Sequence, residues 1–575
     1  MKRWPLFLLT LLAAAVVGWA SVQVPTPQPY TAPVDQFAAG RAMADVRQLA
    51  SQPHPTGSAA NLANIGALER RLASLGFATR RVVTPLPEKP ASRLAKWGGN
   101  PATSPAISLV ATRAGRDRSL PAVALMAHHD SVWASPGAAD DVAGVAAALE
   151  IARAIPAASQ QRDLVLLITD AEELGLVGAR AILAPGAAAD PIAAKIGVII
   201  NLEARGGGGR AMMFQTGPDN GALVRRFAAL TPGASGSSLA VTLYENLPND
   251  TDFTPAKLRG MMGLNFAFIG NAWGYHSPLM TPDRLDQGGL QHLGDSALAI
   301  TRDLLTAPAL PARAPNAVFA SAPFLGVISY DVGAGWAILA AAVLLLGLAA
   351  WWRRGEWTVA GGLMAFGQEL LVLIIAGLLL FGLNLLSGSV GSEYYDRLAA
   401  LPRLEAMAGL ALLAVLVVLA GAPAGTLWDR WLAWGKLCLL AALAVQILLP
   451  GAGPVFAWSA LLAALAAAIA ARPGAAGAGQ TVPAALIAIP GLALGAELFH
   501  FAFLGIGGPL PFALVPLLLP VLALAAPLLP GGPRRPALLA GGICLALAAG
   551  IALWVNLDAT APSVPPYAGT EKKQG

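Results

Sequence analysis

The stretch Ala122-Val-Ala-Leu-Met-Ala-His128-His129-Asp130 decides the fold of the first half of the chain. Its apolar residues form a short uninterrupted run, which is typical of a strand buried on both faces of a parallel sheet. The run ends in two histidines and an aspartate. Because ligands bind at the carboxyl edge of such a sheet, these polar residues are candidates for a functional site.

Further apolar runs of this kind flank the first one, and residues with helical spacing lie between them. The predicted strands are Ala106–Thr112, Leu164–Thr169, Gly197–Leu202, Ala211–Gln215 and Leu264–Ile269. The predicted helices are Leu62–Leu75, Val142–Ala154 and Leu285–Leu305. This alternation predicts an α/β sandwich with a largely parallel sheet over residues 35–305.

The composition changes near residue 310, after which long Ala, Leu, Val and Gly stretches are broken by brief polar loops. These stretches, and one at the N-terminus, approach the roughly 20 residues that cross a bilayer as a helix. The predicted spans are 4–24, 332–352, 358–386, 404–422, 432–450, 454–471, 482–504, 509–530 and 536–556. The predicted parts of the chain are an N-terminal membrane segment (1–24), the α/β domain (35–305), a linker (306–331), an all-α membrane domain (332–556) and a tail (557–575).

The N-terminal segment has two interpretations. Gly18 and Ala20 offer small residues at plausible cleavage positions for a signal peptide. The uncharged length from Trp4 to Val24 favours a retained membrane anchor instead. In both cases the α/β domain is exported.

Loop charges predict the orientation, because Lys and Arg in short loops are retained on the cytoplasmic side. Lys2 and Arg3 predict a cytoplasmic N-terminus, and basic residues then recur in every second loop. These are Arg353, Arg354, Arg430, Lys436, Arg472, Arg534 and Arg535. We therefore expect a multi-pass protein of the lipid bilayer. Its α/β domain would be periplasmic in a bacterial inner membrane, which the Ala-rich composition favours, or luminal in an organelle.

Charge and cysteine content exclude several classes of site. The net charge of +5 is small for 575 residues, and its cations form no basic stripe, so nucleic acid is not an expected partner. Cys438 and Cys544 both lie in apolar stretches, which leaves no disulfide framework and no cysteine metal site. Any bound metal must therefore use histidine and carboxylate ligands.

Polar residues of those two kinds follow the predicted strands. His128 and Asp130 follow the first run, and Glu172-Glu173 follow Leu164–Thr169. Glu203 comes directly after Gly197–Leu202, and His276 follows Leu264–Ile269. Since the carboxyl ends of parallel strands share one edge of the sheet, these segments are expected to converge on one site.

The chemistry of this set favours zinc, which binds His nitrogen and carboxylate oxygen. Two zinc ions need a bridging carboxylate, and Asp140, at the start of the helix Val142–Ala154, offers a rigid origin for it. Of the adjacent Glu172 and Glu173, one could bind metal while the other takes a proton from a zinc-bound water. Asp130 is close enough in sequence to accept the second ring hydrogen of His128.

Five motifs now resemble a known family. The strings AHHDSV (127–132), PGAADDVAGV (136–145), DAEELGLVGA (170–179), INLEARGGGG (200–209) and YHSPLMTPD (275–283) are similar in order and spacing to the co-catalytic di-zinc aminopeptidases. The resemblance implies a three-layer α/β sandwich around a mixed sheet. Together with the membrane spans, the chain looks like the vacuolar and endoplasmic-reticulum membrane proteases of that family.

The resemblance also implies roles for individual residues. His128 and Glu203 would bind one zinc, Glu173 and His276 the other, and Asp140 would bridge both. Glu172 would be the general base. It further implies a cis peptide bond between Asp140 and Asp141.

The predicted function is therefore a membrane-anchored di-zinc metallopeptidase, most readily an aminopeptidase acting on peptide substrates. Endopeptidase, carboxypeptidase and glutaminyl-cyclase activities occur on related scaffolds and stay open as alternatives. A different class of protein is also possible, in which the membrane half is a transporter or scaffold and the outer domain binds peptides as an accessory.

Overall fold

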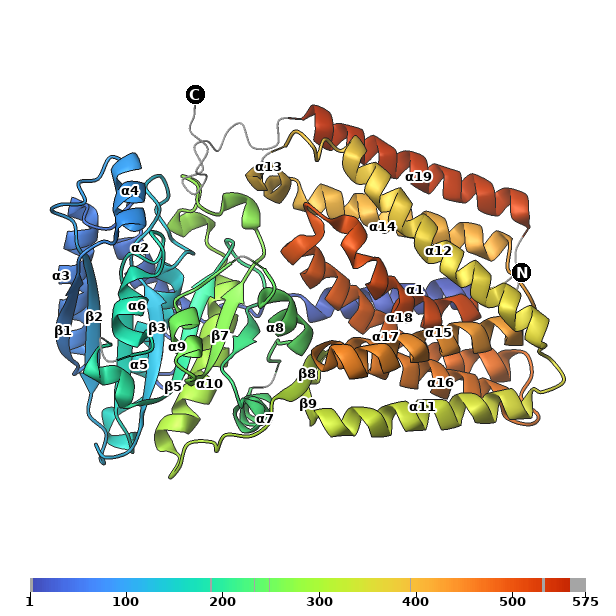
Figure 1. Cartoon of the computed structure of the whole chain (residues 1–575), viewed down its shortest axis with the longest axis horizontal. Helices are drawn as coiled ribbons and strands as arrows, with labels where there is room; N and C mark the ends of the chain where they lie inside the picture. Colours follow the sequence, from blue (N-terminus) through green and yellow to red (C-terminus); the bar gives the residue numbers. More distant parts are fainter. Residues whose placement is uncertain are drawn as a thin grey trace. The chain divides into compact units, whose positions relative to one another are not determined.

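The computed structural model describes residues 4–558 except 187–188, 232, 248, 393 and 530–532. Lys2, Arg3 and the predicted tail beyond Asp558 therefore lie outside the described residues. The described chain forms two compact units, one of residues 23–317 and one of residues 4–22 together with 318–558. Figure 1 shows the first unit with its sheet and the second as a set of long helices.

The first unit is built on a seven-stranded sheet with the order β1-β2-β4-β3-β5-β7-β6. The central strands β4, β3, β5 and β7 are parallel, whereas β2 and β6 pair antiparallel with their neighbours. The strands are β1 (Ala78–Thr84), β2 (Ala106–Arg113), β3 (Ala122–His128), β4 (Leu164–Thr169), β5 (Ile196–Ala204), β6 (Met212–Thr216) and β7 (Met262–Phe268). The mixed, largely parallel sheet confirms the predicted fold class.

Helices cover both faces of this sheet. They are α2 (Ala39–Leu49), α3 (Ala59–Ser74), α4 (Glu88–Lys96), α5 (Val142–Ala154), α6 (Val177–Leu183), α7 (Gly221–Leu230), α8 (Ser238–Tyr244), α9 (Phe253–Leu258) and α10 (Gln287–Thr306). Helices α5 and α10 pack on β3 and β5. Ala124 and Met126 of β3 share a buried cluster with Ile182 of α6 and Phe253 of α9. Because side chains alternate along a strand, α6 and α9 cover the opposite face.

The start of α5 fixes the loop that carries Asp140. Asp141 is the N-cap: one of its carboxylate oxygens accepts from the backbone N–H of Gly144 at 3.1 Å, and the other accepts from the N–H of His128 at 3.2 Å. The cap therefore ties the helix to the end of β3. A side chain at position 144 would collide with the Asp141 carboxylate, so glycine is required there.

The second unit contains, among its described residues, nine helical segments long and apolar enough to cross a membrane. They are Trp4–Ser21 (α1), Val332–Trp352 (α11), Val359–Leu386 (α12), Leu401–Gly421 (α14), Leu427–Leu448 (α15), Pro454–Ala471 (which includes α16), Ala478–Gly507 (which includes α17), Pro511–Leu528 (which includes α18) and Arg534–Leu557 (α19). Each predicted span falls on one of these segments. A further short helix, α13 (Tyr394–Ala399), precedes α14.

The predicted linker differs from the structure in its second half. Residues 306–331 were expected to be irregular, yet β8 (Ala317–Ala322) and β9 (Gly326–Asp331) pair in a two-stranded sheet. The reason is local: Val318, Phe319, Val327 and Ile328 are β-branched or aromatic residues that favour strands. Only the Pro- and Ala-rich stretch before them lacks regular structure.

Candidate metal centre

The predicted ligands meet at the carboxyl edge of the sheet. His128 is the last residue of β3, and Glu203 is the penultimate residue of β5. Glu173 lies in the turn after β4, His276 in the loop after β7, and Asp140 just before α5. Among the described residues, two groups have ligand atoms within 4.8 Å of one another: His128 with Asp140 and Glu203, and Glu173 with Asp140 and His276.

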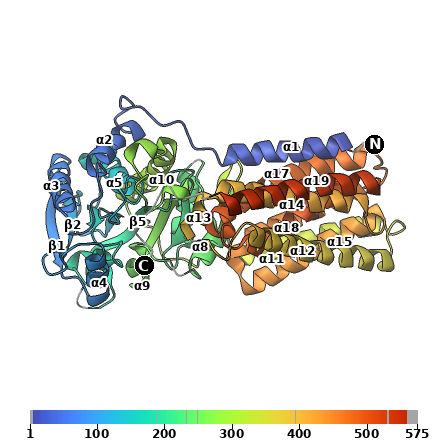
Figure 2. The ribbon, with the colours of Figure 1, turned by 90° about the horizontal axis from the view of Figure 1, so that it is seen from above.

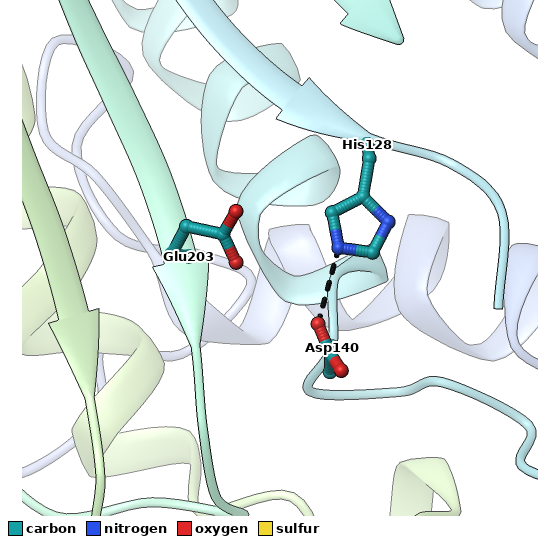
Figure 3. Close-up of side chains that lie close together, drawn as sticks. All are labelled: His128, Asp140 and Glu203. Atoms are coloured by element: carbon teal, nitrogen blue, oxygen red, sulfur yellow. Dashed lines mark hydrogen bonds and ion pairs between the residues drawn. The ribbon is translucent and has the colours of Figure 1, made fainter. Parts of the chain in front are cut away.

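Asp140 is common to both groups, and its two oxygens face different histidines. Oδ1 lies 3.1 Å from Nε2 of His128, whereas Oδ2 lies 3.0 Å from Nε2 of His276. Nε2 of His276 also lies 3.2 Å from Oε1 of Glu173. Figure 3 shows the first group, with the Glu203 carboxylate and the His128 ring facing each other beside Asp140. The peptide bond from Asp140 to Asp141 is cis.

The charges of this cluster fit a pair of cations. All five predicted ligand residues are buried or nearly so. Burial raises the pKa of Glu203 well above its usual range, and the neighbouring carboxylate of Asp141 adds to the rise. Burial also raises the pKa of Glu173. Divalent cations between these oxygens would remove the cost of burying like charges together. Histidine nitrogen and carboxylate oxygen are donors that zinc binds with bonds of about 2.0–2.2 Å.

Asp130 has a different contact from the one predicted. Nδ1 of His128 donates to the backbone oxygen of Asp130 at 3.0 Å, and the Asp130 carboxylate is farther away, at 3.5 Å. That carboxylate instead accepts from the backbone N–H groups of Glu172 and Glu173, at 3.1 and 3.2 Å. Asp130 therefore fixes the ring of His128 through its carbonyl and the Glu172-Glu173 turn through its carboxylate.

Glu172 lies beside the metal groups and is half-buried. Burial raises its pKa well above the usual range; His128 opposes this rise, whereas the carboxylates of Glu173 and Asp252 add to it. The preceding residue, Ala171, has a φ of +59°, and His276 has a φ of +56°. Positive φ is uncommon outside glycine, so both positions are held in a strained backbone conformation at the site.

Two residues near the base were not predicted as part of the site. Asp252 is fully buried, and the Thr169 hydroxyl at the end of β4 hydrogen-bonds its carboxylate. Burial raises the pKa of Asp252 to about 6. Tyr244 ends α8, and burial together with the charges of Glu203 and Glu172 raises the pKa of its phenol. No motif marks Tyr244 in the sequence, because only the fold brings α8 to this edge.

Tyr275 directly precedes the predicted ligand His276. Its ring stacks on the imidazole of His276, with centroids 3.7 Å apart and an angle of 20° between the planes. The stacking restricts the orientation of the His276 ring. His129 is buried, and its Nε2 lies 3.1 Å from the carbonyl oxygen of Ile107.

Comparison with known proteins gives the site a family. Residues 108–301 match the model of peptidase family M28. Endoplasmic reticulum metallopeptidase 1 of Mus musculus is 34% identical over 245 residues, which are 40% of this chain and 27% of that protein. Vacuolar membrane protease of Clavispora lusitaniae is 30% identical over 316 residues, which are 51% of this chain and 29% of that protein. The chain thus matches less than a third of the length of these relatives.

A solved structure, the aminopeptidase from Aneurinibacillus sp. strain AM-1, aligns with 49% of this chain and 98% of its own, at 15% identity and a TM-score of 0.37.

Proposed function

We propose that this protein, in which residues 108–301 form a peptidase family M28 domain, is a membrane-anchored di-zinc aminopeptidase. The observation that carries the proposal is the position of Asp140 between two histidines, one on each carboxylate oxygen. Two ions bound here would each have a histidine and a carboxylate of their own, and Asp140 would serve both. His128 and Glu203 would hold one zinc, Glu173 and His276 the other.

When bound, two zinc ions supply Lewis acidity: they polarise the substrate carbonyl and lower the pKa of water to about 7. The remaining work falls to side chains of this chain. Glu172 takes a proton from the attacking water and passes it to the nitrogen of the leaving group as the peptide bond breaks. A raised pKa suits a group that must both accept and release a proton near neutral pH.

The Asp130 carboxylate fixes the turn that carries Glu172. Because the Asp130 carboxylate accepts from two consecutive backbone N–H groups, the positions of Glu172 and Glu173 are linked. One side chain serves the metal group while its neighbour serves the substrate. Asp130 is therefore a positioning residue in this mechanism.

The preference for a free N-terminus is supported by charge. The site has five carboxylates, those of Asp140, Glu172, Glu173, Glu203 and Asp252. When all five are ionised they carry one negative charge more than the four positive charges of two divalent ions. A substrate with a protonated or metal-ligating amino group is favoured there, whereas an acetylated one loses that contact.

Two measurements test the proposal on the purified chain. Free peptides should be hydrolysed in the presence of zinc, and neither chelator-treated protein nor Glu172→Gln should hydrolyse them at more than a small fraction of that rate. Peptides that differ only by N-acetylation should be poor substrates. Equal hydrolysis of free and acetylated peptides would exclude the aminopeptidase activity, and full activity of Glu172→Gln would exclude Glu172 as the base.

The N-terminal helix is proposed to be a retained anchor. Its residue Gly18 packs so closely on α17 (Ala478–Ala502) that a Cβ there would lie 3.0 Å from the Cβ of Ala496. Figure 2 shows α1 beside α17. Small residues that allow two backbones to approach are typical of helix association in membranes. The peptidase unit would then lie on the non-cytoplasmic side, as loop charges predict.

A further inference from the structure

The loop between α11 and α12 packs against the start of α15 and brings aromatic and basic side chains together. The hydroxyl of Thr426, the N-cap of α15, donates to the carbonyl of Glu356 at 2.9 Å. The backbone N–H of Thr358 donates to the carboxylate of Asp429 at 2.9 Å. The relative positions of this loop and of α15 are therefore fixed by hydrogen bonds.

Three cation–aromatic pairs occur at this junction. The guanidinium of Arg353 lies 5.3 Å from the ring centroid of Trp428, and that of Arg354 lies 4.8 Å from Trp351. The ammonium of Lys436 lies 5.6 Å from the ring of Trp357. Contacts of this kind hold a cation at a defined place without neutralising its charge.

Lys436 belongs to the helix α15, and its side chain reaches an aromatic ring of the loop between α11 and α12. It is the tenth residue after Thr426, so its Cα is about 15 Å along the helix axis from the cap. Side chains on a helix lean toward its N-terminus, and the Nζ atom reaches the ring of Trp357 in the preceding loop. An exposed lysine that extends its ammonium along a membrane helix in this way keeps the charge at the bilayer surface.

Arg354 and Lys436 have no carboxylate within ion-pair distance in the part of the chain that the structure describes. The two acidic groups of the junction are already engaged. Glu356 pairs with Arg353 at 2.8 Å, and Asp429 accepts from the N–H groups of Thr358 and Thr426. Both cations are exposed, so a counter-ion from outside the chain can reach them.

Two other cations of this unit, Arg403 of α14 and Arg397 of α13, give a useful contrast. Arg403 also lies over a tryptophan, Trp554, at 4.8 Å, but it forms an ion pair with Asp558 at 2.6 Å. Arg397 is buried and donates to the carbonyls of Gly508 and Ser387. Thus these two cations are neutralised or saturated by protein groups, whereas Arg354 and Lys436 are not.

We propose that the junction of the α11–α12 loop with α15 binds the headgroup of an anionic phospholipid, and that Arg354 and Lys436 supply positive charge for this binding. Three features favour a lipid over a soluble phosphate. Arg354 follows the end of α11, the ammonium of Lys436 lies over Trp357 in the loop after that helix, and Trp351 beside Arg354 is 64% exposed. Exposed tryptophans at helix ends lie at the level of the lipid headgroups. Basic pockets between membrane helices are known to take anionic headgroups on the cytoplasmic side.

The test measures lipid binding and is independent of peptidase activity. The purified full-length chain in detergent is titrated with phosphatidylglycerol or with phosphatidylcholine of the same acyl chains, and bound lipid is measured by native mass spectrometry. The wild type should prefer phosphatidylglycerol. The double variant Arg354→Gln/Lys436→Gln should lose roughly tenfold or more in affinity for it. The variant Lys436→Arg, which keeps the charge, should retain most of the binding.

The matched control is Arg534→Gln/Arg535→Gln, which removes two exposed cations from the start of α19 and should bind as the wild type does. If this control loses as much affinity as the first variant, the attraction is a general effect of charge and the site is excluded. Equal binding of the two lipids would also refute the proposal. Complete competition by soluble glycerol phosphate at equal concentration would show a phosphate site rather than a lipid site.

Discussion

Replacing Asp140 by asparagine tests the shared carboxylate directly. The substitution keeps the size of the side chain and one acceptor oxygen, but it replaces the other oxygen by an amide that donates. One of the two contacts, to His128 or to His276, is therefore lost. Because Asp140 belongs to both metal groups, we expect Asp140→Asn to lower the affinity for both zinc ions. Glu203→Gln should lower the affinity only for the ion of its own group.

The size of the effect follows from these contacts. A hydrogen bond to a charged group contributes about 1.5–3 kcal/mol, so the zinc-free protein should lose about that much stability. Zinc at a hundred times its dissociation constant adds about 2.7 kcal/mol per site, or about 5 kcal/mol for two. In a unit of this size that gain corresponds to a rise of roughly 10–20 °C in Tm. Asp140→Asn should show almost no rise in Tm when zinc is added.

The assay is thermal unfolding of the purified chain with chelator and with added zinc, together with the zinc content by elemental analysis. Asp250→Asn, an exposed aspartate outside both groups, is the matched control and should show the full shift. If Asp140→Asn keeps two zinc ions and the wild-type shift, the bridging role is wrong. If it keeps one, Asp140 serves a single ion and the two groups are independent.

Two further predictions concern residues behind the ligands. The folded pKa of Asp252 is raised to about 6 from 3.8, so this group lowers stability as the pH rises through that window. In the zinc-free protein, Asp252→Asn should therefore raise the free energy of unfolding by roughly 2–3 kcal/mol at pH 7.5 and leave it unchanged at pH 4. An equal effect at both pH values would contradict this prediction. Asp130→Asn turns an amide toward the N–H of Glu172 or Glu173, and kcat should fall roughly 10–100-fold. An unchanged kcat would refute the positioning role.

The convergence of the predicted ligands could be expected from the sequence because most of them follow buried strands. Each apolar run that leads to the site is fully covered in the structure, and the polar residue after it has only one edge of the sheet to occupy. His128 and Glu203 are thus positioned by their strands. Asp140 is positioned by the start of α5, whose N-cap is the next residue, Asp141.

Other parts of the site depend on tertiary contacts that leave no local pattern. The short spacing of Asp130 and His128 suggested a carboxylate–imidazole bond, but the loop lets the carbonyl take that role and turns the carboxylate to the Glu172 turn. Strand β1 was missed for a related reason. Its sequence, Ala78–Thr84, contains two arginines and is largely exposed at the edge of the sheet, so it has no buried apolar face to mark it.

In the membrane unit, too, the helices could be predicted from the sequence, whereas contacts between distant side chains could not. The spans were predictable because every one needs a long apolar stretch, whatever its neighbours are. The contact between Lys436 and Trp357 was not predictable, because two spans, α12 and α14, separate these residues in the sequence. In the sequence, Lys436 counted only as one positive charge of a cytoplasmic loop. In the structure it is a cation held on an aromatic ring without a carboxylate partner, and such a charge at a membrane surface requires a counter-ion from the lipid or from solution.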